Sequence, residues 1–136
     1  MKDVEQFIPH RNSMKLIDDI ISADDNEITV KCRVTKNWPL FQEGTVNAVV
    51  LVEVLAQTAA AGIGWRERHR DTVNRGYLVG LKKCRFYASS VPVDSELVAY
   101  SRVLRESDNY AVIGGNVSAG DTLLFEGQVQ VVRKEE

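Results

Sequence analysis

The sequence contains little of the chemistry that metal sites, disulfide scaffolds or polyanion binding require. Its 136 residues include only two cysteines and two histidines, namely Cys32, Cys84, His10 and His69. Their separations match no zinc-binding pattern. The formal net charge is -2, so no basic surface for nucleic acid or for an anionic membrane is expected. We therefore expect no metal, no cofactor and no nucleic-acid partner.

Three other kinds of motif are missing. Residues 1–9 are polar and short, so no signal peptide is predicted, and both cysteines are expected to be reduced core residues of a cytoplasmic protein. No serine flanked by glycines forms a nucleophile elbow, and no glycine-rich loop could cradle a phosphate group. These absences argue against serine hydrolase and nucleotide-binding chemistry.

What the sequence does have is one apolar run, residues 48–65, AVVLVEVLAQTAAAGIGW. Apolar or small residues occur on every side of a helical wheel, so a helix here has no solvent face. The run is long enough to be considered as a membrane span, but Glu53 and Gln57 would lie inside it. We therefore predict a buried helix over residues 45–68, with Thr45 as its N-cap, and no membrane partner.

Glu53 and Gln57 stand four residues apart and share one stripe of the predicted helix. A buried, unpaired carboxylate is costly, and it usually responds by a rise in its pKa. Such a group can donate a proton near neutral pH. Glu53 is therefore the first candidate catalytic residue.

The rest of the chain reads as strands. A short helical turn is predicted at residues 3–8, a hairpin is predicted from residues 14–21 and 28–34, and four further strands are predicted at residues 77–87, 96–104, 110–117 and 122–132. Short connections favour antiparallel pairing. The prediction is one α+β domain over residues 1–136, with an antiparallel sheet of about six strands around one long helix. Such a sheet covers only part of the helix, so a dimer is expected.

Several short motifs, in this order and spacing, resemble one family. They are Pro9-His10-Arg11, Met14-Lys15-Leu16-Ile17-Asp18, Leu51-Val52-Glu53-Val54-Leu55-Ala56-Gln57, Leu78-Val79-Gly80-Leu81, Arg85-Phe86 and Val91-Pro92-Val93-Asp94. Together they are similar to the hotdog-fold 3-hydroxyacyl-[acyl carrier protein] dehydratases of the FabZ and FabA type, over nearly the whole chain.

The resemblance implies a fold, a reaction and a set of site residues. It implies a hotdog homodimer, or a higher oligomer of such dimers, that dehydrates a 3-hydroxyacyl thioester of acyl carrier protein or coenzyme A. In that family a glutamate at the position of Glu53 protonates or orients the departing hydroxyl, and a histidine of the other subunit removes the C2 proton. The substrate-binding residues expected here are Gln57, Thr45, Val46, Asn47, Phe41 and Gly80, with amides near residues 45–47 polarising the thioester carbonyl at the helix N-terminus.

The chain departs from the family pattern where the histidine should be. The family has a GHFPG loop before the helix, whereas residues 41–47 read FQEGTVN and contain no histidine. This resembles the short-loop dehydratases encoded with aryl-polyene synthesis clusters. Three explanations stay open: His10 supplies the imidazole, Glu43 acts as a carboxylate base, or the protein only binds acyl chains. A hotdog thioesterase, which activates water with a carboxylate on the same helix, is the alternative enzyme.

Overall fold

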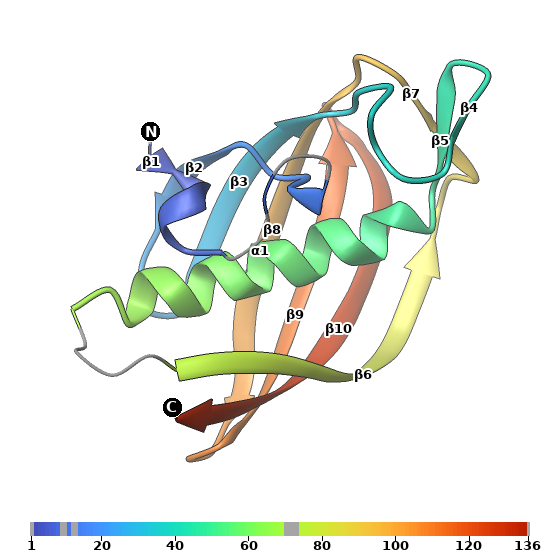
Figure 1. Cartoon of the computed structure of the whole chain (residues 1–136). Coiled ribbons are helices and arrows are strands. Elements are labelled where there is room, and N and C mark those ends of the chain that lie inside the picture. Colours follow the sequence, from blue (N-terminus) through green and yellow to red (C-terminus); the bar gives the residue numbers. More distant parts are fainter. Residues whose placement is uncertain (1, 9–10, 12–13, 70–73, 136) are drawn as a thin grey trace.

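One long helix, α1 (Val50–Arg66), lies across the inner face of a curved antiparallel sheet (Figure 1). The computed structural model describes residues 2–8, 11, 14–69 and 74–135. The larger sheet has seven strands in the order β1-β2-β3-β8-β9-β10-β6, and a smaller one has the order β4-β5-β7. The larger sheet comprises β1 (Lys2–Asp3), β2 (Asp19–Ala23), β3 (Glu27–Arg33), β8 (Glu96–Glu106), β9 (Tyr110–Ala119), β10 (Thr122–Glu135) and β6 (Asn74–Phe86); the smaller comprises β4 (Phe41–Gln42), β5 (Thr45–Asn47) and β7 (Ser90–Pro92). The predicted α+β class and the helix wrapped by a sheet are confirmed.

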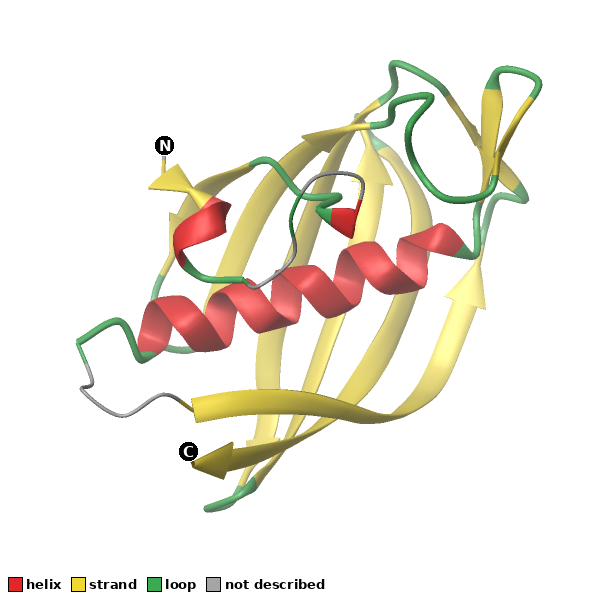
Figure 2. Cartoon of the chain, viewed as in Figure 1, coloured by secondary structure: helices red, strands yellow, loops and turns green. Residues whose placement is uncertain are grey.

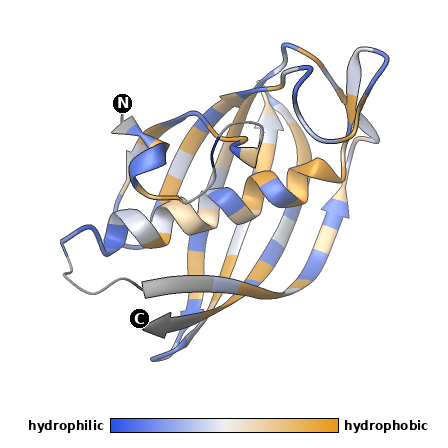
Figure 3. Cartoon of the chain, viewed as in Figure 1, coloured by the Kyte–Doolittle hydropathy of each residue, from blue (hydrophilic) through white to orange (hydrophobic). Residues whose placement is uncertain are grey.

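In β3 and β8, alternating apolar positions place one face of the strand against the helix, and Figure 3 shows apolar and polar residues alternating in bands along the sheet. In β3, for example, Ile28, Val30 and Cys32 are buried while the residues between them are half-buried or exposed. The predicted hairpin is present, since β2 pairs antiparallel with β3. However, β2 begins only at Asp19, and further back the Leu16 amide bonds to the helix side chain of Gln57 rather than to a strand.

The helix begins later than predicted. Residues 45–47 form β5, which pairs with both β4 and β7, so Thr45 is not the N-cap. The N-cap is Val49, which makes no side-chain capping bond. Instead the Asn47 side-chain oxygen accepts a hydrogen bond from the Val49 amide at 2.9 Å. The smaller sheet thus lies just before the helix N-terminus, as Figure 2 shows.

Strand β6 forms one edge of the larger sheet and pairs only with β10. It carries large apolar side chains that stay exposed in the single chain: Tyr77, Leu78, Val79, Leu81 and Phe86. A long, apolar edge strand with unpaired backbone groups is a surface on which another strand can pair. Cys84, on the same strand, is exposed, so its prediction as a core residue is wrong, whereas Cys32 is buried as predicted.

The pKa of Asp18 predicts a pH dependence of stability. Burial raises the pKa of this carboxyl, although a hydrogen bond from the Arg33 amide acts in the opposite direction. The folded state therefore binds the Asp18 proton more tightly than the unfolded chain does. The stabilisation is complete below the ordinary carboxyl pKa and is lost as pH rises through the raised pKa.

We expect Asp18→Asn to gain thermal stability relative to wild type as pH rises from about 4 to about 7. The asparagine stays neutral and can still accept from the Arg33 amide. Asp24→Asn is the contrast, because backbone hydrogen bonds from Asn26 and Glu27 lower the pKa of exposed Asp24, so its contribution is lost as pH falls. Unfolding temperatures of both variants across this range test the signs, and parallel curves for Asp18→Asn and wild type would contradict the assignment.

Candidate functional site

The site is organised by the side-chain amide of Gln57, which is fully buried. Its oxygen accepts a hydrogen bond from the Leu16 amide at 2.9 Å, and its nitrogen donates to the Met14 carbonyl at 2.7 Å. These two backbone contacts fix which end of the amide is the donor. The same nitrogen donates to Oε1 of Glu53 at 3.1 Å. One helical stripe and one backbone segment thus orient the carboxylate together.

Glu53 is half-buried in the single chain, not enclosed in the helix core. The expectation of a fully buried carboxylate is therefore wrong, and Gln57 donates a hydrogen bond to it. The helix does pack its other face on the sheet: Leu51, Val54 and Leu55 are almost completely buried. Glu53 lies on the side that the chain's own sheet does not cover.

Of the predicted substrate-binding residues, Gln57 contacts Glu53, whereas Thr45, Val46 and Asn47 belong to β5. Val46 is fully buried and Thr45 half-buried in β5, so neither is in the first turn of the helix. The prediction of first-turn amides at residues 45–47 is wrong for the same reason. Phe41 is exposed in β4. A side chain at Gly80 would meet the Gln130 amide oxygen, which places Gly80 against the side chain of the neighbouring strand β10.

Backbone amides at the observed helix N-terminus also have hydrogen-bond partners. The Leu51 amide donates to the Ala48 carbonyl at 3.0 Å and the Val52 amide to the Val49 carbonyl at 3.1 Å. With the Val49 amide bonded to Asn47, three amides at this end already have partners. These three amides are therefore not free to polarise a thioester carbonyl at the helix N-terminus.

The structure places only some of the residues that could act as the base. His10 lies outside the described residues, so its predicted role is not placed by the structure. Glu43 is exposed in the turn between β4 and β5, where its φ is 51°. His69 lies after the end of α1 and is exposed. Among the described residues, no histidine lies in the segment that precedes the helix.

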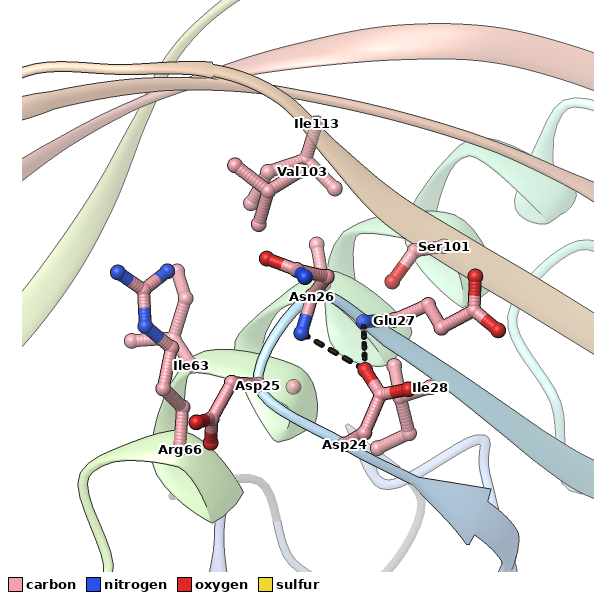
Figure 4. Close-up of a pocket in the computed structure, with 12 residues that line it drawn as sticks. Asp24, Asp25, Asn26, Glu27, Ile28, Ile63, Arg66, Ser101, Val103 and Ile113 are labelled. Carbon is pink, nitrogen blue, oxygen red and sulfur yellow. Dashed lines mark hydrogen bonds between the residues drawn. The ribbon is translucent and has the colours of Figure 1, made fainter.

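Glu53 lines neither of two hollows in the described part of the chain. The first, of about 20 Å³, lies between the β2–β3 turn and the C-terminal half of α1, with Gly62, Ser101 and Ile113 among its lining residues (Figure 4). It has room for about one water molecule. Gly62 is nine residues beyond Glu53, about two and a half turns, and so faces the opposite side of the helix.

The second hollow is a wider groove of about 590 Å³ on the larger sheet, lined from β6, β8, β9 and β10. Arg85, Arg102 and Gln128 are among its residues. Their neighbours Phe86, Ser101 and Val129 face the helix side, so these three face away from it. An acyl chain bound to Glu53 needs walls that neither hollow supplies.

A buried amide with three partners predicts a stability effect. Replacement of Gln57 by leucine leaves the buried Leu16 amide and the Met14 carbonyl without their side-chain partner. We expect Gln57→Leu to lower the free energy of unfolding by about 2–4 kcal/mol, because each orphaned buried group costs about 1–3 kcal/mol. Urea denaturation measures this loss.

Gln130→Leu is the control, since the Gln130 amide donates to the Tyr110 hydroxyl at an exposed site. It should change the free energy of unfolding by less than about 1 kcal/mol. Equal effects of the two substitutions would show that the Gln57 contacts do not hold the segment.

Within the described ranges, no three histidine, cysteine or acidic side chains are grouped so that they could hold a metal ion. No helix in the same ranges is both long and apolar enough to span a bilayer.

Comparison with known proteins points to one family. The model of the ApeP-like family, described as ApeP dehydratase, matches residues 2–136. The 3-hydroxyacyl-[acyl-carrier-protein] dehydratase FabZ of Streptococcus equi subsp. zooepidemicus is 34% identical over 139 residues, which cover 92% of this chain and 95% of the relative. The FabZ of Oceanobacillus iheyensis is 29% identical over 139 residues, covering 92% and 98%.

Solved structures agree on the fold. The dehydratase heterocomplex ApeI:P from Xenorhabdus doucetiae contains a chain that superposes with a TM-score of 0.87 at 21% identity, covering 98% of this chain and 92% of that one. A hypothetical thioesterase with coenzyme A from Streptococcus pneumoniae superposes with a TM-score of 0.68 at 11% identity, covering 87% and 86%. At these identities the likeness concerns the hotdog fold, which dehydratases and thioesterases share.

Proposed function

Because the chain belongs to the ApeP-like dehydratase family, we propose that it removes water from a 3-hydroxyacyl thioester of acyl carrier protein or coenzyme A. The product is the trans-2-enoyl thioester, in fatty-acid or polyketide-like biosynthesis, and the proposed compartment is the cytoplasm. The observation that carries the proposal is the Glu53 carboxylate, oriented by the buried Gln57 amide at 3.1 Å on the side of α1 that the sheet does not cover.

In the proposed reaction Glu53 is the general acid. Its Oε1 accepts the Gln57 N–H, so the transferable proton of the neutral acid belongs on Oε2. That proton goes to the departing 3-hydroxyl, which leaves as water while a base removes a proton from C2. Two positioned groups are needed because neither the hydroxyl nor the C2 proton leaves readily by itself.

We propose His10 as the base, because it is the histidine of the Pro9-His10-Arg11 motif and belongs to the same N-terminal segment that Gln57 holds at residues 14 and 16. An imidazole is suited to this role, since its ordinary pKa is close to neutral. Exposed Glu43 is the other candidate. His10→Ala and Glu43→Ala, measured side by side, distinguish the two.

We further propose that the chain acts as a dimer joined along β6. Its exposed apolar residues, Leu78, Val79 and Leu81 among them, lie on an edge strand of 13 residues. A second copy would cover these side chains and supply the missing walls beside Glu53. The relative from Xenorhabdus doucetiae is described as a heterocomplex, so a second hotdog chain of different sequence is the alternative partner for the same edge.

The experiment that tests the function follows both possible products of one substrate. The purified chain is incubated with 3-hydroxyacyl carrier protein and with the coenzyme A thioester, while enoyl thioester and free thiol are measured together. Enoyl thioester without free thiol supports the dehydratase. Free thiol without enoyl product indicates a thioesterase, a candidate that the shared fold favours, and binding with neither product indicates an acyl-binding protein.

A further inference from the structure

The guanidinium group of Arg11, the last residue of the Pro9-His10-Arg11 motif, bonds to the backbone at residues 5 and 8. Its Nη1 donates to the Ile8 carbonyl at 2.7 Å and its Nη2 donates to the Glu5 carbonyl at 2.8 Å. Its Nε lies 3.1 Å from Oε1 of the Glu5 carboxylate. All three nitrogens of one guanidinium group are thus committed to the segment that precedes the motif.

Glu5 extends this cluster to the far side of the motif. Its Oε2 lies 3.3 Å from the Lys15 ammonium, so one carboxylate joins Arg11 and Lys15. The Glu5 amide is itself held by the Asp3 side chain at 2.9 Å, at the start of the 3-10 helix η1 (Val4–Gln6). The cluster therefore fixes residue 5, residue 8, residue 11 and residue 15 relative to one another.

Residues on either side of the Pro9-His10-Arg11 motif contact α1. At one end the Phe7 carbonyl approaches so closely that a Cβ on Gly64 would lie 2.5 Å from it. At the other end the Met14 carbonyl and the Leu16 amide bond to Gln57. Gln57 and Gly64 are seven residues apart, so the attachment points span roughly 10 Å of the helix.

These attachments lie on the side of the helix that bears the candidate acid. Glu53, Gln57 and Gly64 follow one another at spacings of four and seven residues, which places them on one stripe. Arg11 is linked to the backbone at residues 14–16 in two ways. Glu5 bridges the Arg11 guanidinium and the Lys15 ammonium, and the Met14 amide donates to the Arg11 carbonyl at 3.1 Å. Loss of the guanidinium removes the Glu5 bridge, so residues 14 and 16 can move away from the Gln57 amide, and the amide then loses its fixed orientation towards Glu53.

We infer that Arg11 is a positioning residue for the dehydration, acting through the residue 14–16 backbone and Gln57 on the Glu53 carboxylate. The inference rests on the proposed function, which makes Glu53 the acid. Arginine is required because its planar fork bonds two carbonyl groups and a carboxylate at once, whereas the single ammonium of lysine cannot hold that geometry. Arg11 itself touches no substrate in this account.

The test compares Arg11→Ala and Arg11→Lys with Arg33→Ala. Arg33 is a matched control, because it is an exposed arginine paired with Glu96 at 2.9 Å on the sheet. We expect Arg11→Ala to lower kcat by about 10- to 100-fold, the range over which a misplaced catalytic group reduces turnover, while KM changes less than about threefold. Arg11→Lys should recover little of the loss, and added guanidinium at millimolar concentration should restore part of it in Arg11→Ala. Arg33→Ala should keep the wild-type kcat.

A second measurement needs no turnover. The Leu16 amide is buried against Gln57, so its hydrogen exchange should become at least about tenfold faster in Arg11→Ala than in Arg33→Ala. The Ile20 amide, in β2, should exchange at the same rate in both. If the wild-type chain does not dehydrate any thioester, the proposed function fails, yet this exchange result still decides whether Arg11 holds the segment.

Either of two results would overturn the inference. One is a wild-type kcat in Arg11→Lys together with wild-type thermal stability, which would show that a single positive charge is enough. The other is unchanged exchange of the Leu16 amide in Arg11→Ala. Should Arg11→Ala fail to fold, Arg11→Lys and the exchange of its Leu16 amide decide the question.

Discussion

Glu53→Gln should lower the rate of dehydration by about 10²- to 10⁴-fold, the contribution typical of a positioned general acid. The glutamine amide has nearly the shape of the carboxyl group, and its oxygen can still accept the Gln57 N–H. It cannot give up a proton to the departing hydroxyl. The loss should therefore appear in kcat, with thermal unfolding within a few degrees of wild type.

Glu96→Gln is the control for this experiment. Glu96 is an exposed carboxylate that pairs with Arg33 on the larger sheet, so its replacement removes a charge without touching α1. It should leave kcat unchanged. Retention of more than about a tenth of the wild-type rate by Glu53→Gln would show that Glu53 is not the general acid, although the fold assignment would stand.

Leu81→Asp should dissociate the proposed dimer and abolish turnover with it. In a two-fold interface the substitution occurs twice, so two carboxylates would be desolvated near one another along the β6 edge. Like charges brought together in an interface cost several kcal/mol, which weakens association by more than about 100-fold. Sedimentation analysis over a range of concentrations measures the dissociation constant, and the dehydration assay is repeated at the same concentrations.

Leu104→Asp is a closely matched control. Leu104 is 47% exposed and Leu81 is 46% exposed in the single chain, but Leu104 lies on β8, three strands away from the free edge. Its variant should stay dimeric and active. An active, monomeric Leu81→Asp protein would show that one chain carries the complete site.

The fold could be predicted from sequence where the spacing of apolar residues along the chain decides the local structure. Alternation in residues 28–34 and the run of apolar residues before Trp65 are local patterns, and they correctly give β3 and α1. The start of α1 could not be predicted in this way. Thr45 has the chemistry of an N-cap, yet it pairs with Pro92 in β5, and that contact joins residues 47 positions apart in the chain.

Which residues of the helix are buried could not be predicted either, because burial also depends on contacts between residues far apart in the chain. The apolar composition of the helix correctly indicates a core element, but it cannot say which side faces the chain's own sheet. Glu53 lies on the side left uncovered, with Gln57 as its donor. The sequence also suggests a hydrogen bond between these two, since they are four residues apart.

The role of Arg11 was hidden from sequence reasoning, although its motif was not. Charge and spacing alone do not show that its guanidinium bonds the carbonyls of Glu5 and Ile8. A sequence does not indicate which backbone carbonyl groups will accept hydrogen bonds from a side chain. Conversely, Cys84 looks like a core residue in an apolar strand, and only the sheet order reveals that β6 is an edge.

The most direct test of the central claim is the position of a heavy-oxygen label. A 3-hydroxyacyl carrier protein is incubated with the chain in water enriched in the heavy oxygen isotope, and the acyl group is analysed by mass spectrometry. Reversible dehydration at Glu53 predicts label in the 3-hydroxyl group, and none with Glu53→Gln. Label in a released carboxylic acid, or no label in any product, would contradict the account.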